Sequence, residues 1–328
     1  MRRKSVQEYI PYSQQPNPQE NSVSMNNIVL FSISALIWGS TWLMITFQLG
    51  VVEPLVSVVY RFALASLILF GYCFIRARKF DFSKSDHLYI FIQGLLLFGF
   101  NYWLTYIGVT KINSALAAVL STSIVYFNVV FARIFLGDPI KKEVLAGATI
   151  GVVGVILIFM PEIEIADNRN ETLTGIWLIL GGSIFASLGN VVSAKTQRRK
   201  IPVLQANALG MGYASILFVS IVLIAGYDFQ IEMTFSYLGS LIYLALFGSV
   251  IAFGAFLTVL GRIGPDKAGY ISLVYPVIAI IISTFFEGYQ WTIYSIFGLT
   301  IILLGNFIAM GKYKQFAIFK RWKKQPEA

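Results

Sequence analysis

The chain has 328 residues, of which 57% are hydrophobic and only 12% are charged, and its net charge is +9. A soluble domain carries about 25% charged residues, so this composition excludes a soluble fold with a water-facing surface of this size and indicates an apolar surrounding such as a lipid bilayer. The cations form short clusters between long apolar runs, which argues against a nucleic-acid-binding face.

Apolar segments of spanning length follow one another along the chain. Residues 1–27 are polar and contain three prolines, so we expect a disordered cytoplasmic tail there. Crossing a hydrocarbon core of about 30 Å takes about 20 helical residues. Ten segments meet this length, at 28–47, 55–75, 88–108, 113–132, 144–160, 174–194, 203–225, 236–260, 268–286 and 292–311. A basic segment, 312–328, is expected to form a second cytoplasmic tail.

The distribution of basic residues gives the orientation. If the amino terminus is cytoplasmic, 22 of the 25 Lys and Arg residues fall on the inner side, two fall on the outer side and Arg61 lies inside a span. Short loops rich in Lys and Arg remain in the cytoplasm. We therefore predict a multi-pass protein of a bacterial-type inner membrane with both termini cytoplasmic.

The two halves of the chain resemble each other. WLTYIG at 103–108 aligns with FLTVLG at 256–261, and AGATIGVVG at 146–154 aligns with FGLTIILLG at 297–305. The second alignment pairs Gly147 with Gly298 and Gly154 with Gly305. The expected fold is an all-α integral membrane protein whose ten transmembrane helices form two five-helix repeats, 28–160 and 174–311. Because five is odd, the repeats are inverted, an arrangement that recurs in secondary transporters.

Several motifs are similar to those of a known family. They are ALIWGSTW (35–42), YRFALASL (60–67), NYWLTYIGVTKINSALAAVLSTS (101–123), FLGDPIKKEVLAGATIGVVGVIL (135–157) and YISLVYPVIAIIISTFFEG (270–288). The chain resembles the drug/metabolite transporter superfamily, in its branch with tandem EamA domains. Asp138 stands where that family usually has Glu. The resemblance implies a central cavity lined by both repeats and alternating access for small organic solutes such as amino acids, metabolites or drugs.

Arg61 is the most distinctive single residue. It lies about six residues into the second predicted span, which is about 9 Å below the outer boundary at 1.5 Å per residue. An intramembrane arginine costs at least about 2.5 kcal/mol on insertion scales, so it should face a cavity or a partner. It would bind a substrate carboxylate or phosphate; the alternatives are snorkelling to the surface and a structural bond to backbone carbonyls.

Polar and aromatic residues within the spans are the remaining candidates for the cavity. They are Trp38, Ser40, Thr41, Asn101, Trp103, Tyr106, Asn128, Asn190, Asn207, Thr258, Tyr270 and Tyr275. For any one of them the alternative is a hydrogen bond between helices. We select as substrate-binding residues Trp38, Thr41, Arg61, Asn101, Trp103, Asn190, Tyr270 and Tyr275. Trp42, Trp177 and Trp291 lie near span ends and are expected to anchor the protein at the membrane interface. Pro276 could support a kink or a gate.

The residues and motifs that the sequence lacks exclude several classes of function. No Asp or Glu lies well inside a span, which favours facilitated diffusion or exchange over proton coupling. The chain has no phosphate-binding Gly-Lys-Ser/Thr loop and no metal-ligand cluster, so we expect neither an enzyme nor a cofactor. Cys73 is expected to be a small core residue and His87 a solvated loop residue.

These observations predict a secondary transporter of small organic solutes, in the export direction, working by alternating access between the two repeats. Two alternatives stay open: import of an anionic solute through Arg61, and a membrane receptor or assembly subunit that does not transport. The expected partners are a small-molecule substrate and the lipid bilayer, without nucleic acid; a homodimer is also left open.

Overall fold

The computed structural model describes residues 23–137, 139–140, 142–165 and 169–309, and every secondary-structure element in these ranges is helical. The elements are α1 (Val23–Thr46), α2 (Pro54–Ile75), α3 (Lys84–Gly94), η2 (Leu95–Phe100), α4 (Asn101–Val109), α5 (Ser114–Leu120), η3 (Ser121–Ser123), α6 (Ile124–Leu136), α7 (Lys142–Ile165), α8 (Arg169–Arg198), α9 (Val203–Ala225), α10 (Phe235–Tyr243), η4 (Leu244–Ile251), α11 (Ala252–Ile263), α12 (Pro265–Ala268), η5 (Gly269–Leu273), α13 (Tyr275–Phe286) and α14 (Ile293–Ala309). Of the two expected tails, residues 1–22 and 312–328 lie outside the described residues, and α1 begins five residues before the expected span.

Long apolar helices dominate the described part of the chain. Seven helical segments in it are long and apolar enough to cross a membrane: Asn26–Thr46, Pro54–Ile75, Lys84–Val109, Ser114–Leu136, Arg169–Arg198, Val203–Ala225 and Phe235–Ile263. Tyr275–Phe286 and Ile293–Ile308 are apolar but shorter. Large apolar side chains face outward, among them Phe74 at 87% exposure and Phe235 at 93%. Such faces are stable only against lipid.

Local sequence signals set the helix ends. The Asn113 side chain accepts a hydrogen bond from the backbone N–H two residues later and starts α5. Ser83 and Asp86 form a reciprocal capping box at the start of α3. Gly137 and Gly226 end α6 and α9 with positive φ angles of 76° and 72°, a conformation in which a Cβ would be strained. These polar residues and glycines mark the ends of helices whose apolar residues alone would not define them.

Four short helical segments depart from α-helical geometry. η2 and η4 are π-helical segments within continuous helices, and η3 and η5 are 3₁₀ segments. In η4 the Ser249 hydroxyl donates to the Leu244 carbonyl at 2.9 Å, which satisfies an acceptor of the wider turn. Pro276 lies in the first turn of α13, where its missing N–H costs no helical bond. It therefore begins a helix after η5 and does not kink a continuous one.

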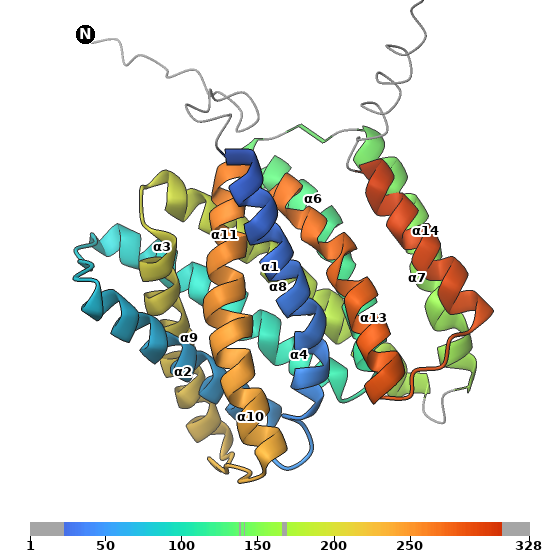
Figure 1. Ribbon diagram of the computed structural model, residues 1–328, viewed down its shortest axis with the longest axis horizontal. Coiled ribbons are helices and arrows are strands. Elements are labelled where there is room, and N and C mark those ends of the chain that lie inside the picture. Colours follow the sequence, from blue (N-terminus) through green and yellow to red (C-terminus); the bar gives the residue numbers. More distant parts are fainter. Residues whose placement is uncertain (1–22, 138, 141, 166–168, 310–328) are drawn as a thin grey trace, which may run out of the picture.

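The helices pack in a few dominant pairs (Figure 1). α1 packs against α11 and α13, while α8 packs against α3, α4 and α6. α2 packs against α9, and α7 against α14. The start of α1 and the end of α14 lie at the same end of the molecule, and the α7–α14 pair forms one side of it (Figure 1).

Glycines bring α7 and α14 into backbone contact. A Cβ on Gly154 would lie 2.7 Å from the Gly298 carbonyl oxygen, and one on Gly305 would lie 2.7 Å from that of Gly147. The sequence alignment pairs Gly147 with Gly298 and Gly154 with Gly305. In space the contacts are exchanged, because the two helices run antiparallel (Figure 1).

A second glycine stripe holds α8 against α4 and η2. Gly175, Gly182 and Gly189 recur every seven residues on one face of α8. A Cβ on Gly182 would lie 3.0 Å from the Asn101 carbonyl oxygen, and one on Gly189 would lie 2.5 Å from Leu97 Cγ. The small residues let these backbones approach closely, as is usual between membrane helices.

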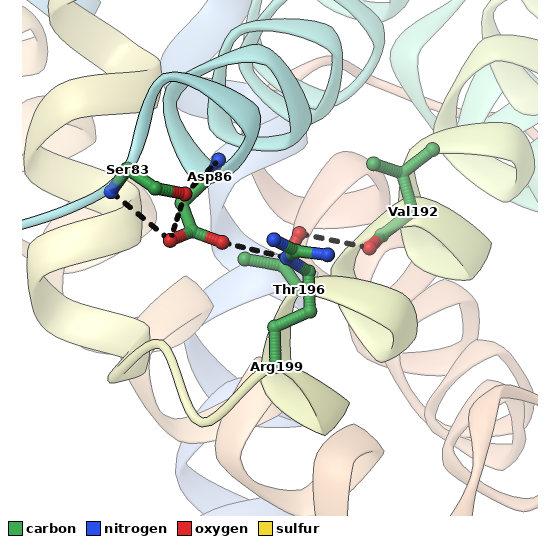
Figure 2. A network of polar contacts seen from close by, with 5 residues as sticks. All are labelled: Ser83, Asp86, Val192, Thr196 and Arg199. Carbon is green, nitrogen blue, oxygen red and sulfur yellow. Dashed lines mark hydrogen bonds and ion pairs between the residues drawn. The ribbon is translucent and has the colours of Figure 1, made fainter.

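An ion pair lies at each end of this contact between α8 and the continuous helix formed by α3, η2 and α4. Arg199 Nε lies 2.6 Å from Asp86 Oδ1, and Figure 2 shows that the other oxygen of Asp86 is held by Ser83 at the start of α3. At the opposite end, Lys111 Nζ lies 3.5 Å from Glu171 Oε1. The continuous helix of α3, η2 and α4 is thus held against α8 along its whole length.

Candidate functional site: a central cavity

A cavity lies among helices from both parts of the chain. It holds about 780 Å³ of space not filled by protein atoms, counting the part that is open to solvent. Its lining comes from α1, η2, α4, η3, α6, α8, α11, η5 and α13. The centre of a water-sized sphere can move through about 100 Å³ of it, which is room for several water molecules or one small solute.

Five of the six aromatic side chains that line the cavity come from α1, α11 and α13, and we call them the aromatic wall: Trp38, Trp42, Phe253, Phe256 and Tyr275. The Trp38 ring centroid lies 5.0 Å from that of Phe253 and 4.9 Å from that of Phe256. Trp42 stacks on Tyr275 with centroids 6.4 Å apart. The helices α1, α11 and α13 supply these rings and set their spacing.

Hydrogen bonds fix two of these rings. Trp38 Nε1 donates to the Gly248 carbonyl at 3.2 Å, and the Tyr275 hydroxyl is 2.6 Å from Ser121 Oγ. A buried Trp N–H or Tyr O–H normally requires such a partner. The aromatic wall is therefore oriented before any ligand arrives.

Five amide and hydroxyl side chains also line the cavity, and we call them the polar wall: Asn101, Thr105, Asn128, Ser183 and Asn190. They come from α4, α6 and α8. Asn190 Nδ2 donates to Asn128 Oδ1 at 3.3 Å, which links α8 to α6. Asn190 is 1% exposed, and its Oδ1 has no hydrogen-bond partner among the described residues. A buried acceptor left unpaired costs about 1–3 kcal/mol, so this oxygen is suited to a ligand donor.

Arg61 is fully buried beside the cavity but does not line it. Its Nε donates to Ser249 Oγ at 3.0 Å and its Nη1 to the Tyr106 hydroxyl at 3.4 Å. Its guanidinium carbon lies 4.3 Å from the centroid of the Tyr102 ring, and Tyr102 does line the cavity. Nη2 has no partner among the described residues, and a Cβ on Gly248 would lie only 3.1 Å from it. Cation–π and hydrogen-bond contacts thus hold the charge behind the wall.

The eight residues selected from the sequence divide into three groups. The cavity is lined by Trp38, Thr41, Asn101, Asn190 and Tyr275. Arg61 and Trp103 lie outside the lining; the Trp103 ring packs instead against Phe218 of α9, with centroids 5.8 Å apart. The side chain of Tyr270 lies outside the part of the chain whose side chains the structure describes.

Trp42 corrects the expected set of interface anchors. It is 8% exposed and belongs to the aromatic wall, whereas Trp177 and Trp291 are exposed. Trp42 follows Trp38 by four residues, so the two share a helix face, and this spacing was a usable signal. Phe253 and Phe256 gave no such signal, because phenylalanine is common on every face of an apolar span.

The single histidine and cysteine do not form a reactive site. His87 lies in the first turn of α3, half-buried, and its Nδ1 is 2.6 Å from the Tyr213 hydroxyl. It is therefore part of a helix contact and not a loop residue. Cys73 is buried, as expected. Among the described residues no group of three His, Cys, Asp or Glu side chains could hold a metal ion.

Comparisons with known proteins agree with the resemblance inferred from the motifs. The model of the EamA-like transporter family matches residues 25–160 and again residues 173–311. The chain is 28% identical over 285 residues to the uncharacterized inner membrane transporter YedA of Escherichia coli K12, covering 85% of this chain and 89% of that protein. It is 28% identical over 289 residues to the uncharacterized transporter YoaV of Bacillus subtilis, covering 87% and 97%. Protein PagO of Salmonella typhimurium is 23% identical over 289 residues, covering 86% and 92%.

A solved structure has a similar fold. A protein of known crystal structure superposes with a TM-score of 0.66, covering 87% of this chain and 97% of that one. The sequence identity is 15%, so this likeness concerns the fold and carries no information about the ligand.

Proposed function

Because the chain belongs to the EamA-like transporter family and is a membrane transporter, we propose that it is a secondary carrier that exports small organic solutes by alternating access. The observation that carries this proposal is the cavity, which α1, α4 and α6 line together with α8, α11 and α13. A site between two groups of helices is exposed to either side of the membrane when the groups rock against each other.

The proposed architecture is ten spans in two inverted repeats, 28–160 and 174–311. The two matches of the family model support this division. The helix contacts support it as well. The repeat relates α1 to α8 and α4 to α11, so the contact of α1 with α11 corresponds to the contact of α8 with α4. Each repeat also contributes one π-helical and one 3₁₀ segment.

The proposed orientation places both termini in the cytoplasm of a bacterial-type inner membrane. In a Cys73→Ser background, Lys84→Cys and Arg169→Cys place one thiol at each end of the molecule, since both side chains are exposed. A membrane-impermeant maleimide added to intact cells should label Arg169→Cys and spare Lys84→Cys until the cells are permeabilised. Labelling of Lys84→Cys in intact cells refutes this orientation.

Contacts on the proposed outer side of the cavity are suited to gating. On the proposed outer side, the Ser114 hydroxyl donates to Glu287, and the Ser283 hydroxyl donates to Asn113 Oδ1 at 3.3 Å. These bonds join α5 to α13 across the repeats. Opening to that side would break them and bring the buried hydroxyls of Ser114 and Ser283 into contact with water, which replaces the lost bonds at a small net cost.

The absence of acids from the cavity lining supports exchange or facilitated diffusion. Among the described lining residues there is no Asp, Glu, Lys, Arg or His. Proton coupling usually needs an ionisable group at membrane depth. Transport by the purified protein should therefore be insensitive to an imposed pH gradient, and strict dependence on the gradient would refute this point.

Counterflow uptake by the purified protein in liposomes tests the carrier. Vesicles loaded with unlabelled amino acids, nucleosides, organic phosphates or a cationic dye are diluted into the labelled compound. A carrier accelerates the entry of at least one class above protein-free vesicles. Ligand binding without flux of any class, in vesicles shown to hold folded protein, would instead favour a receptor or assembly subunit.

The second candidate is an importer of an anionic solute that binds Arg61. The unpaired Nη2 of this buried side chain favours it. The position of Arg61 behind Tyr102 and outside the lining counts against it. Arg61→Gln should then weaken transport of an anion more than that of a neutral solute; equal losses would leave Arg61 a packing residue.

A further inference from the structure

We propose that the cavity selects an uncharged planar solute that carries hydrogen-bond donors and acceptors along one edge, the chemistry of a nucleobase. This inference rests on the proposed carrier function and names its substrate class. It follows from the different chemistry of the two walls, from the unpaired amide oxygen and from the lack of an ionised lining side chain.

The aromatic wall selects a flat, polarisable face. The Trp38 ring centroid lies 5.0 Å from that of Phe253 and 4.9 Å from that of Phe256. The stacked rings of Trp42 and Tyr275 belong to the same wall. Because the Trp38 N–H and the Tyr275 O–H are already bonded to protein groups, the wall offers a ligand ring faces and edges. Such surfaces prefer offset stacking or edge-to-face contact with another ring.

The polar wall selects a hydrogen-bonding edge. Asn101, Asn128 and Asn190 are amides, which contain both a donor and an acceptor. Asn128 Nδ2 is committed to the Pro265 carbonyl at 3.4 Å, and Asn190 Nδ2 is committed to Asn128. These bonds orient the pair and leave Asn190 Oδ1 as an acceptor for a ligand N–H. Each of these NH2 groups also has a second hydrogen to donate to a ligand C=O, so a ring with N–H and C=O groups along its edge matches this arrangement.

Charge is disfavoured because nothing in the lining compensates it. The described lining residues include no ionised side chain. Placing an ion in a low-dielectric site without a counter-charge is costly. Arg61 is the nearby cation, but its guanidinium stacks on Tyr102 and is bonded to Ser249 and Tyr106. A carboxylate in the cavity would therefore face Tyr102 and not the guanidinium.

Three compounds with one ring skeleton separate these requirements. Uracil is flat, neutral and has donors and acceptors on its edge. Dihydrouracil keeps the same polar edge but loses the aromatic ring, and orotate keeps the ring but adds a carboxylate. In liposomes containing the full-length protein, uracil counterflow should be about tenfold faster than that of dihydrouracil, the discrimination expected for one lost ring contact. It should exceed that of orotate by at least about tenfold, because an uncompensated charge in the cavity costs more than a lost ring contact.

A matched pair of variants tests the polar wall. Asn190→Leu removes the amide, keeps the branched shape with the same number of side-chain heavy atoms, and should slow uracil counterflow about tenfold. Asn207→Leu is the control, because Asn207 is equally buried in a spanning helix, α9, but does not line the cavity. It should stay within about twofold of the parent chain. Size-exclusion profiles of both variants show whether they fold, and the compound comparison on the parent chain does not depend on them.

The outcomes separate the inference from the carrier itself. Faster exchange of orotate than of uracil overturns the inference and assigns the site to Arg61. Equal exchange of dihydrouracil and uracil overturns the requirement for a planar ring. Exchange of an amino acid or an organic phosphate, but of neither uracil nor adenine, overturns the substrate class and leaves the carrier standing. No exchange of any solute contradicts the carrier as well.

Discussion

Two helix contacts flank the cavity and are built from different materials. Where α8 meets α4 and η2, Gly175, Gly182 and Gly189 bring backbones together, and an ion pair lies at each end. Where α1 meets η4 and α11, large rings and side-chain hydrogen bonds fill the contact, with Trp38 between two phenylalanines and bonded to Gly248.

The difference accounts for the two walls of the cavity. On α8 the glycines occupy the close contact, so Ser183 and Asn190 can point into the cavity with their polar atoms. On α1 the bulky Trp38 serves both purposes, because it fills the helix contact and lines the cavity. Two contacts in equivalent places of the proposed repeats therefore differ in what a substitution would damage: packing in the first, and packing together with ligand contact in the second.

The glycine contact should be the most sensitive to added volume. In Gly189→Leu even the Cβ would lie 2.5 Å from Leu97 Cγ, and overpacking of this kind costs about 3 kcal/mol or more. Folded protein should fall sharply in size-exclusion chromatography. Gly71→Leu is the control, since a Cβ there meets nothing within 4 Å, and it should behave as the parent chain. Equal behaviour of the two variants would mean that α8 does not need the close approach.

Substitution in the aromatic contact should destabilise the protein less than substitution in the glycine contact, but it should also reduce transport. Trp38→Leu removes two ring contacts and one hydrogen bond, and we expect about 2 kcal/mol of destabilisation. Thermal unfolding in detergent and counterflow in liposomes measure both effects. Trp177→Leu, at a tryptophan that is 71% exposed, should leave both unchanged. Full transport by Trp38→Leu would remove Trp38 from the site.

A buried amide in the turn after α1 should have a smaller effect. Gln48 Nε2 donates to the Tyr237 carbonyl at 2.9 Å and to Ser240 Oγ at 2.8 Å, which ties this turn to α10. Gln48→Leu should cost about 1 kcal/mol, the net value of a typical hydrogen bond. The thermal midpoint should drop relative to Gln230→Leu, an exposed position between α9 and α10. An unchanged midpoint would mean that ring packing alone holds this contact.

The ion pairs should contribute least. A double-mutant cycle of Asp86→Asn with Arg199→Gln should give a small coupling that high salt reduces, because both partners are accessible to solvent. It should still exceed the coupling of Lys111 with Glu171, since the Asp86 carboxylate is also held by Ser83 (Figure 2). A coupling that resists salt would show that the pair is shielded in solution.

Part of the cavity lining was predictable residue by residue. Trp38, Thr41 and Asn101 were selected as polar or aromatic residues at mid-span, and they line the cavity. Trp103 was selected by the same rule and faces α9, because it lies two residues beyond Asn101 and so about 200° around the helix. Residue type alone does not distinguish these two directions, and the spans are apolar on all faces, so periodicity did not distinguish them either.

The sequence by itself determined the surroundings and the family, because charge scarcity, the clustering of Lys and Arg and the repeated motifs are properties of the chain alone. It also identified Arg61 as a residue that needs a partner. Which partner it has was decided by tertiary structure: Tyr102 and Tyr106 reach it from α4, and Ser249 reaches it from η4. The same holds for the two walls, since a helix pattern fixes which side chains share a face, but only packing against other helices decides whether that face meets lipid, a neighbour or the cavity.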